Sequence, residues 1–205
     1  MLSRVVTNLV RDALNDSALV TWTDADLIKY LNNAVLAIVT IRPDASYVTE
    51  NITLAAGTRQ SLPANRRRLI RVIRNTSGGE SIRKIDKDIL DTLDPDWHQT
   101  TGSVIKEYAY NEKSPKEFWV YPGATGSISV DITSTSIPAT VSDLDADDFP
   151  LDDSYSPAAV EHMLYQAWSG DDESTPTYAK SAQRLNNFYS ILGQKTQTDV
   201  GMADQ

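Results

Sequence analysis

Residues 23–39, TDADLIKYLNNAVLAIV, decide the fold of this chain because they join a helix start signal to a long helical stripe. Thr23, followed three residues later by Asp26, resembles a capping box, with Asp in place of the usual Glu. Pro43 ends the predicted helix, since proline cannot continue one. The apolar residues after the cap repeat at helical spacing; they are Leu27, Ile28, Leu31, Ala34, Val35, Ile38 and Val39.

Toward the N-terminus, a second stripe predicts a helix that ends at Asn15 and Asp16. Its apolar residues are Val5, Val6, Leu9, Val10 and Ala13. Because the two helices are close in sequence, we expect them to pack against each other as an antiparallel hairpin.

Two more helices are predicted near the C-terminus. Ser156 is the expected N-cap of the third helix, Pro157 its first residue, and Gly170 stops it. The fourth helix closes near Gly193. The third stripe contains Val160, Met163, Leu164, Ala167 and Trp168, and the fourth contains Tyr178, Ala182, Leu185, Tyr189 and Leu192. Four stripes require mutual burial, which predicts one bundle made of residues 1–45 and 154–194, followed by a flexible polar tail, 195–205.

The middle of the chain has strand character. Segments such as YVTENITL (47–54), SVIKEYAY (103–110), KEFWVYP (116–122) and SISVDITS (127–134) are short and rich in β-branched and aromatic residues. A strand is favoured over residues 69–74, and a short helix is expected over residues 86–93. The predicted fold class is therefore α+β: a helical bundle with an inserted antiparallel β-rich region, 46–153, that ends in an acidic linker.

Composition narrows the function. The 205 residues are 40% apolar and include no cysteine, so thiol chemistry and disulfides are excluded. No stretch has the length of a membrane span or the apolar core of a signal peptide, and we expect a protein made and used in water. Residues 1–142 contain 16 acidic and 16 basic side chains, whereas residues 143–205 contain 12 and 3. A net charge of −9 argues against gripping nucleic acid, because basic clusters supply that affinity.

We expect no catalytic residue, no cofactor and no metal. Neither GxxxxGK[ST] nor GxGxxG nor GxSxG occurs, and the two histidines, His98 and His162, have no partner at a fixed spacing. Asp143, Asp145 and Asp147 are spaced like the first ligands of a calcium loop. The glycine and the final carboxylate of that loop are replaced by Asp148 and Ser154. A solvated acidic linker is the favoured interpretation, with weak calcium binding as the alternative.

A basic cluster is the most unusual local feature. Arg59, Arg66, Arg67, Arg68, Arg71 and Arg74 fall in sixteen residues without Asp or Glu. The simpler interpretation is a solvated strand edge that resists unwanted pairing. Our hypothesis is a subunit interface, formed by Arg66, Arg67, Arg68, Arg71 and Arg74, that meets acidic surface on a neighbouring copy.

Besides a structural role with a subunit interface, two function classes stay open: an enzyme and a binding module. An enzyme that degrades cell-wall peptidoglycan would need a carboxyl group of raised pKa in a glycan cleft. A carbohydrate- or receptor-binding module would use exposed aromatics of the β-region. Its candidates are Trp97, Trp119, Tyr108, Tyr110 and Tyr121, which are more simply explained as sheet core.

The order of segments resembles a known family. LVRDALND (9–16) and VTWTDADLIKYLNNAVLAIVTIRPDA (20–45) are similar to the first helices of the phage head-to-tail adaptor, or connector, family of short-tailed and related phages. GTRQSLPANRRRLIRVIRN (57–75) and KEFWVYPGA (116–124) look like its β-region. YSPAAVEHMLYQAWSGDDE (155–173) and YAKSAQRLNNFYSILG (178–193) resemble its closing helices.

This resemblance implies a structural virion protein that lies at the head-tail junction and is located in the host cytoplasm during assembly. It further implies a ring, typically of twelve copies, that docks under the portal protein and receives the tail tube or nozzle protein. DNA would pass through this ring, which would bind no specific DNA sequence and no membrane. The resemblance suggests that the polar C-terminal segment of the chain, residues 195–205, becomes ordered when it binds the portal. The candidate portal-binding residues are Gln197, Thr198, Asp199, Val200 and Met202.

Overall fold

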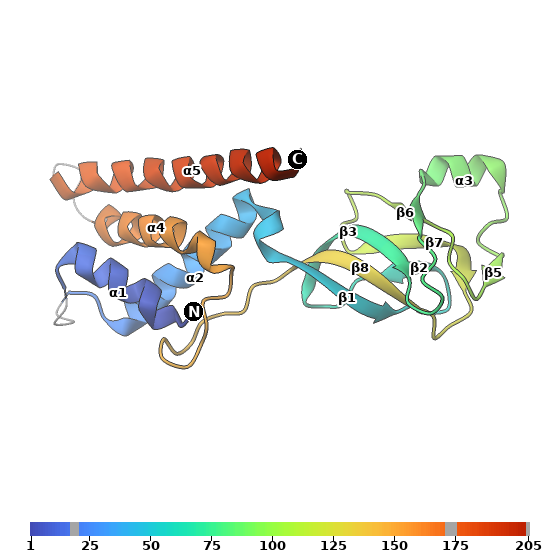
Figure 1. Ribbon diagram of the computed structural model, residues 1–205, viewed down its shortest axis with the longest axis horizontal. Helices are drawn as coiled ribbons and strands as arrows, with labels where there is room; N and C mark the ends of the chain where they lie inside the picture. The colour runs from blue at the N-terminus through green and yellow to red at the C-terminus, as the bar shows by residue number, and fades with distance from the viewer. Residues whose placement is uncertain (17–20, 171–175, 204–205) are drawn as a thin grey trace. The chain divides into compact units, whose positions relative to one another are not determined.

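The computed structural model describes residues 1–16, 21–170 and 176–203. The chain divides into two compact units. The helical unit consists of Met1–Ala45 and Pro138–Gln205, and the β unit consists of Ser46–Ile137. Figure 1 shows long helices in the first unit and the strands in the second. The β unit is thus an insertion between two halves of the helical unit.

Helices from both ends of the chain build the helical unit. Its elements are α1 (Ser3–Leu14), α2 (Asp24–Ile41), the 3₁₀ turn η2 (Asp153–Tyr155), α4 (Ser156–Ser169) and α5 (Pro176–Ala203), with a further 3₁₀ turn, η1 (Pro43–Ser46), at the junction to the β unit. Helix α4 contacts α1, α2 and α5. In the described residues, no helix has the length and apolar character needed to cross a bilayer.

The predicted start of α2 is confirmed, and that of α4 is off by one residue. The Thr23 Oγ1 accepts the Asp26 backbone N–H at 3.2 Å, and the Asp26 carboxylate accepts the Thr23 N–H at 3.0 Å. Helix α4 begins at Ser156 itself, so Tyr155 is the N-cap and no side chain caps the helix. Pro157 still occupies the first turn, where its missing N–H costs no hydrogen bond.

The first stripe is only half buried. Val6 and Val10 lie in the core, but Val5 and Leu9 are exposed, and the buried face also includes Ser3, Thr7 and Arg11. Arg11 explains the difference, because its guanidinium donates to the Asp24 carboxylate at 2.6 Å and to the Trp22 carbonyl at 3.0 Å. A buried cation needs such partners, and these hydrogen bonds hold its side of α1 inward.

Within the helical unit, the segment of residues 138–153 packs on the helices. Val141, Leu144, Phe149 and Leu151 are buried among the helices. The Leu144 carbonyl accepts the Arg4 N–H at 2.9 Å, and the Asp147 carbonyl accepts the Ser3 N–H at 3.0 Å. These bonds satisfy backbone donors of the first turn of α1.

The β unit contains two sheets. Its strands are β1 (Tyr47–Thr53), β2 (Gly57–Ser61), β3 (Arg66–Asn75), β4 (Arg83–Lys84), β5 (Thr101–Gly102), β6 (Glu107–Tyr110), β7 (Glu117–Ala124) and β8 (Ser129–Ser136), and its helix is α3 (Lys87–Leu93). One sheet has the order β1-β8-β3. The other has the order β2-β7-β6-β4, with β5 paired to β7.

The predicted fold class is wrong for the inserted region, which is not a simple antiparallel sheet. Strand β4 pairs parallel with β6, and β5 pairs parallel with β7. Each of these two strands has only two residues, too few to show the alternation by which strands are recognised. What the structure does contain is an α+β chain with helices in its N- and C-terminal parts, a central β region, and five α-helices within the described residues.

Several local predictions in the β unit are confirmed. The segments 103–110 and 116–122 contain strands β6 and β7, which pair antiparallel with Glu107 opposite Tyr121 and Tyr110 opposite Phe118. The ambiguous segment 69–74 lies inside strand β3, and the short helix is α3, capped by Asp86. The β core contains Leu54, Leu62, Leu69, Val72, Ile82, Ile105, Tyr108, Phe118, Val120, Ala124, Val130 and Ile132.

We expect Phe188→Ala to destabilise the helical unit strongly. Phe188 is 1% exposed and joins the core between α4 and α5. Its truncation leaves a cavity and should lower the free energy of unfolding by about 3–5 kcal/mol in urea titrations followed by helical circular dichroism. Tyr189→Ala, at a neighbour that is 54% exposed, is the control and should cost far less. Equal losses for both variants would contradict this packing.

We also expect His162 to make the helical unit less stable in mild acid. Burial against Phe188 lowers the pKa of His162 below its value of 6.5 in the unfolded chain. The unfolded chain therefore binds the proton more readily, and the free energy of unfolding should fall as the pH drops through 6.5. The Gln166 amide donates to the Nδ1 of His162 at 3.0 Å, which also requires the neutral ring. In urea titrations, His162→Gln should reduce the fall in the free energy of unfolding between neutral and mildly acid pH. An equal fall in the variant and the wild-type chain would refute the role of His162.

Candidate functional site

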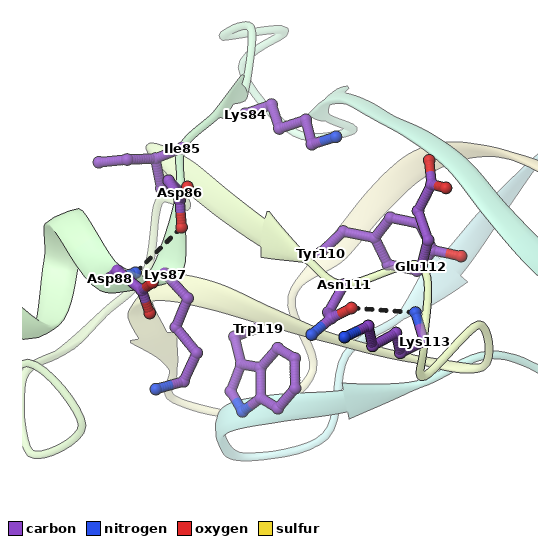
Figure 2. A pocket seen from close by; sticks show the side chains of 10 residues that line it. All are labelled: Lys84, Ile85, Asp86, Lys87, Asp88, Tyr110, Asn111, Glu112, Lys113 and Trp119. Atoms are coloured by element: carbon purple, nitrogen blue, oxygen red, sulfur yellow. Dashed lines mark hydrogen bonds between the residues drawn. The ribbon is translucent and has the colours of Figure 1, made fainter.

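The β unit contains an open pocket of about 760 Å³ (Figure 2). Three segments line it: residues 84–88 at the β4–α3 junction, residues 110–113 at the end of β6, and Trp119 on β7. The Asp86 carboxylate accepts the Asp88 N–H at 3.1 Å, which caps α3. The Asn111 side chain accepts the Lys113 N–H at 2.9 Å, which holds the turn after β6.

The pocket lining combines charged and aromatic side chains. Its ten lining residues are Lys84, Ile85, Asp86, Lys87, Asp88, Tyr110, Asn111, Glu112, Lys113 and Trp119, with three cations and three carboxylates among them. Lys87 is paired to Asp91 at 2.7 Å, and Glu112 is paired to Arg68 at 3.0 Å. Burial raises the pKa of Tyr110. The pocket therefore presents the two partly buried aromatic rings of Tyr110 and Trp119 among side chains of both charges.

The aromatics named from the sequence separate into two groups. Trp97 and Tyr108 are buried, whereas Tyr110, Trp119 and Tyr121 are partly exposed. Only Tyr110 and Trp119 meet in the pocket. Trp97 instead stacks on His98, with ring centroids 3.8 Å apart, and its Nε1 donates to Asp91 at 2.8 Å. Trp97 thereby anchors α3 from its inner side.

The five arginines of the predicted interface all lie on β3, but they are not equivalent. Arg66 bonds Glu50, with its Nη2 2.7 Å from the carboxylate, Arg68 pairs with Glu112, and Arg74 pairs with Asp131 at 2.7 Å. Arg67 and Arg71 are exposed and form no ion pair with the described residues. Only these two retain unneutralised charge for another molecule.

The acidic segment uses its carboxylates within the helical unit. Asp145 forms two hydrogen bonds with Arg4, at 2.6 and 2.8 Å. The pKa of Asp147 is lowered because its carboxylate accepts the backbone N–H groups of Ser142 and Asp143. The described part of the chain contains no group of three or more acidic or histidine side chains placed to hold a metal ion.

The predicted portal-binding residues belong to the last turns of α5. Gln197, Thr198, Asp199, Val200 and Met202 lie in helical backbone that continues to Ala203. Their role at the portal stays a prediction.

One surface was missed in the sequence. Ile89 and Leu93 lie on α3, one turn apart, and both are exposed. Ile85, Ile89 and Leu93 recur every four residues among five aspartates, and this spacing is the signal that marks an outward apolar face.

We expect the arginines of β3 to differ in their effect on folding. The side chain of Arg66 is only 11% exposed, and its hydrogen bonds hold the pKa of Glu50 below the usual range. Glu50→Gln removes the counter-charge and should lower the free energy of unfolding by about 1–3 kcal/mol. Arg67→Gln is the control and should change it by less than about 0.5 kcal/mol in the same urea titration. A larger loss for Arg67→Gln would contradict the assignment.

The comparison with known families identifies the group to which the protein belongs. The family model of the SU10 adaptor protein matches residues 2–204, nearly the whole chain, and confirms the resemblance to phage adaptors. No curated protein matches the chain. The match makes the protein a structural component of a phage virion that associates with other virion proteins. This chain belongs to the SU10 adaptor protein family.

Proposed function

We propose that this protein is a head-to-tail adaptor that forms a ring between the portal and the tail, and that DNA passes through the ring. The family match over residues 2–204 is the observation that supports this proposal, because it covers both units. An adaptor has to bind copies of itself and two other virion proteins. A helical unit and a β unit provide separate surfaces for such contacts, and the ring would hold twelve copies.

The charge distribution supports passage of DNA. The helical unit has 17 acidic and 7 basic side chains, whereas the β unit has 11 and 12. Net negative charge repels phosphates, so a bore lined by the helical unit would not trap the passing DNA. The same imbalance separates the two units into an acidic body and a nearly neutral one.

Two segments are proposed for docking. The end of α5, with Gln197, Thr198, Asp199, Val200 and Met202, would bind the portal, since this segment of polar sequence follows the core residue Leu192. The arginines of β3 would bind a neighbouring copy, with Arg67 and Arg71 as the two that keep free charge. The enzymatic and carbohydrate-binding alternatives stay predictions without a specific observation in their favour.

Portal-templated assembly tests the proposal. Purified chain mixed with its portal ring should give an additional ring of density under the portal in electron micrographs. A chain truncated after Leu192 should fold but fail to bind, because it loses the end of α5. The matched control keeps the length and composition of residues 195–205 and scrambles their order.

Three outcomes are informative. Binding by the truncated chain would remove the α5 end from the portal contact. Binding by the scrambled chain would mean that length and composition suffice. Failure of the full-length chain to associate with the portal would refute the adaptor role.

A further inference from the structure

Helix α3 presents an apolar face that nothing in the described β unit covers. Ile89 is 49% exposed and Leu93 is 76% exposed. The helix is nevertheless held firmly from its inner side, where Leu90 is buried and Asp91 accepts the indole N–H of the buried Trp97 at 2.8 Å. The outward position of Ile89 and Leu93 therefore follows from how α3 is anchored. Burying them against another molecule would remove apolar surface from water.

Carboxylates flank Ile89 and Leu93 along the chain. Residues 86–96 contain Asp86, Asp88, Asp91, Asp94 and Asp96 and a single cation, Lys87. Lys87 is paired to Asp91. Asp86 accepts a backbone N–H, Asp96 accepts from the Gln99 amide, and Asp94 lies 3.5 Å from the Tyr121 hydroxyl. Across the residues that the structure describes, no ion pair neutralises Asp86, Asp88, Asp94 or Asp96. A partner for α3 should accordingly combine positive charge with apolar surface.

Strand β3 has that combination. Arg67 and Arg71 are exposed, and neither forms an ion pair within the described chain. An arginine covers apolar surface with its aliphatic stem while its guanidinium reaches a carboxylate. No ion pair joins α3 to these arginines among the described residues of one chain, which leaves both surfaces available to neighbouring copies.

We propose that the exposed face of α3 in one copy docks on Arg67 and Arg71 of β3 in the next copy. This contact rests on the proposed ring and names its two sides. A head-to-tail ring requires two different, complementary surfaces on each chain. The carboxylates after Asp143 are a weaker match, because Asp145 is bound to Arg4, Asp147 to backbone N–H groups, and Asp153 to the N-terminal amine.

Reciprocal charge reversal tests the contact in the portal-templated assembly. Arg67→Glu with Arg71→Glu, and separately Asp88→Arg with Asp96→Arg, should each lower ring formation at least about tenfold, because each brings like charges together. One chain with all four substitutions should recover most of the assembly. Lys106→Glu with Lys116→Glu, at exposed lysines of the same unit, changes the net charge equally and should leave assembly unaffected. Thermal unfolding of every variant confirms that it is folded.

Cysteine cross-linking measures whether the two surfaces lie close together, independently of the charge substitutions. The chain has no cysteine, so Leu93→Cys in one preparation and Arg67→Cys in another can form a disulfide only between copies. Mixed on the portal, they should give a cross-linked dimer, whereas Leu93→Cys mixed with Lys116→Cys should not. Wild-type rings with no cross-link and no recovery in the fourfold variant would overturn the contact and leave the adaptor role standing. A wild-type chain that forms no ring would overturn both.

Discussion

The apolar face of α4 is the constraint on which the whole structure depends. Its buried residues, which include Ala159, Met163 and Leu164, pack against helices from both ends of the chain. The small side chains of Ala158 and Ala159 allow neighbouring helices to approach closely, and α5 completes the layer with Phe188. Because residues before Ala45 and after Pro138 must meet here, the segment between them is held at its two ends and folds as a separate β unit.

Many charged side chains stabilise the fold through ion pairs within one chain. The N-terminal amine binds Asp153, Arg4 joins Asp24 and Asp145, and Arg66 joins Glu50. These contacts neutralise groups that would otherwise look available in a count of charges. Among the groups that no ion pair neutralises within the described residues are Arg67 and Arg71 on β3 and the aspartates next to the exposed face of α3. An adaptor needs specific neighbours, and a few unneutralised groups beside apolar surface are well suited to distinguish them.

How far prediction succeeded depends on the length of the element. The stripe from Leu27 to Val39 and the box of Thr23 with Asp26 span enough residues for period and cap to agree, and α2 forms as expected. Strands β4 and β5 have two residues each and form only because β6 and β7 lie beside them, so no local pattern revealed the parallel pairs. The inward turn of Arg11 was equally invisible, since it depends on Asp24 and the Trp22 carbonyl.

Periodicity, caps, composition and segment order are local or linear properties, so they sufficed to predict the helices at both ends of the chain, the β-rich middle, the arginine cluster and the family. The continuation of α5 past Gly193 to Ala203 was not predicted. Only the folded chain shows which arginines pair with Glu50, Glu112 and Asp131 and which form no ion pair with the described residues. It also shows which aromatic residues line the pocket and that Leu93 is exposed. These outcomes depend on side chains far apart in the chain, and only folding sets the distances between them.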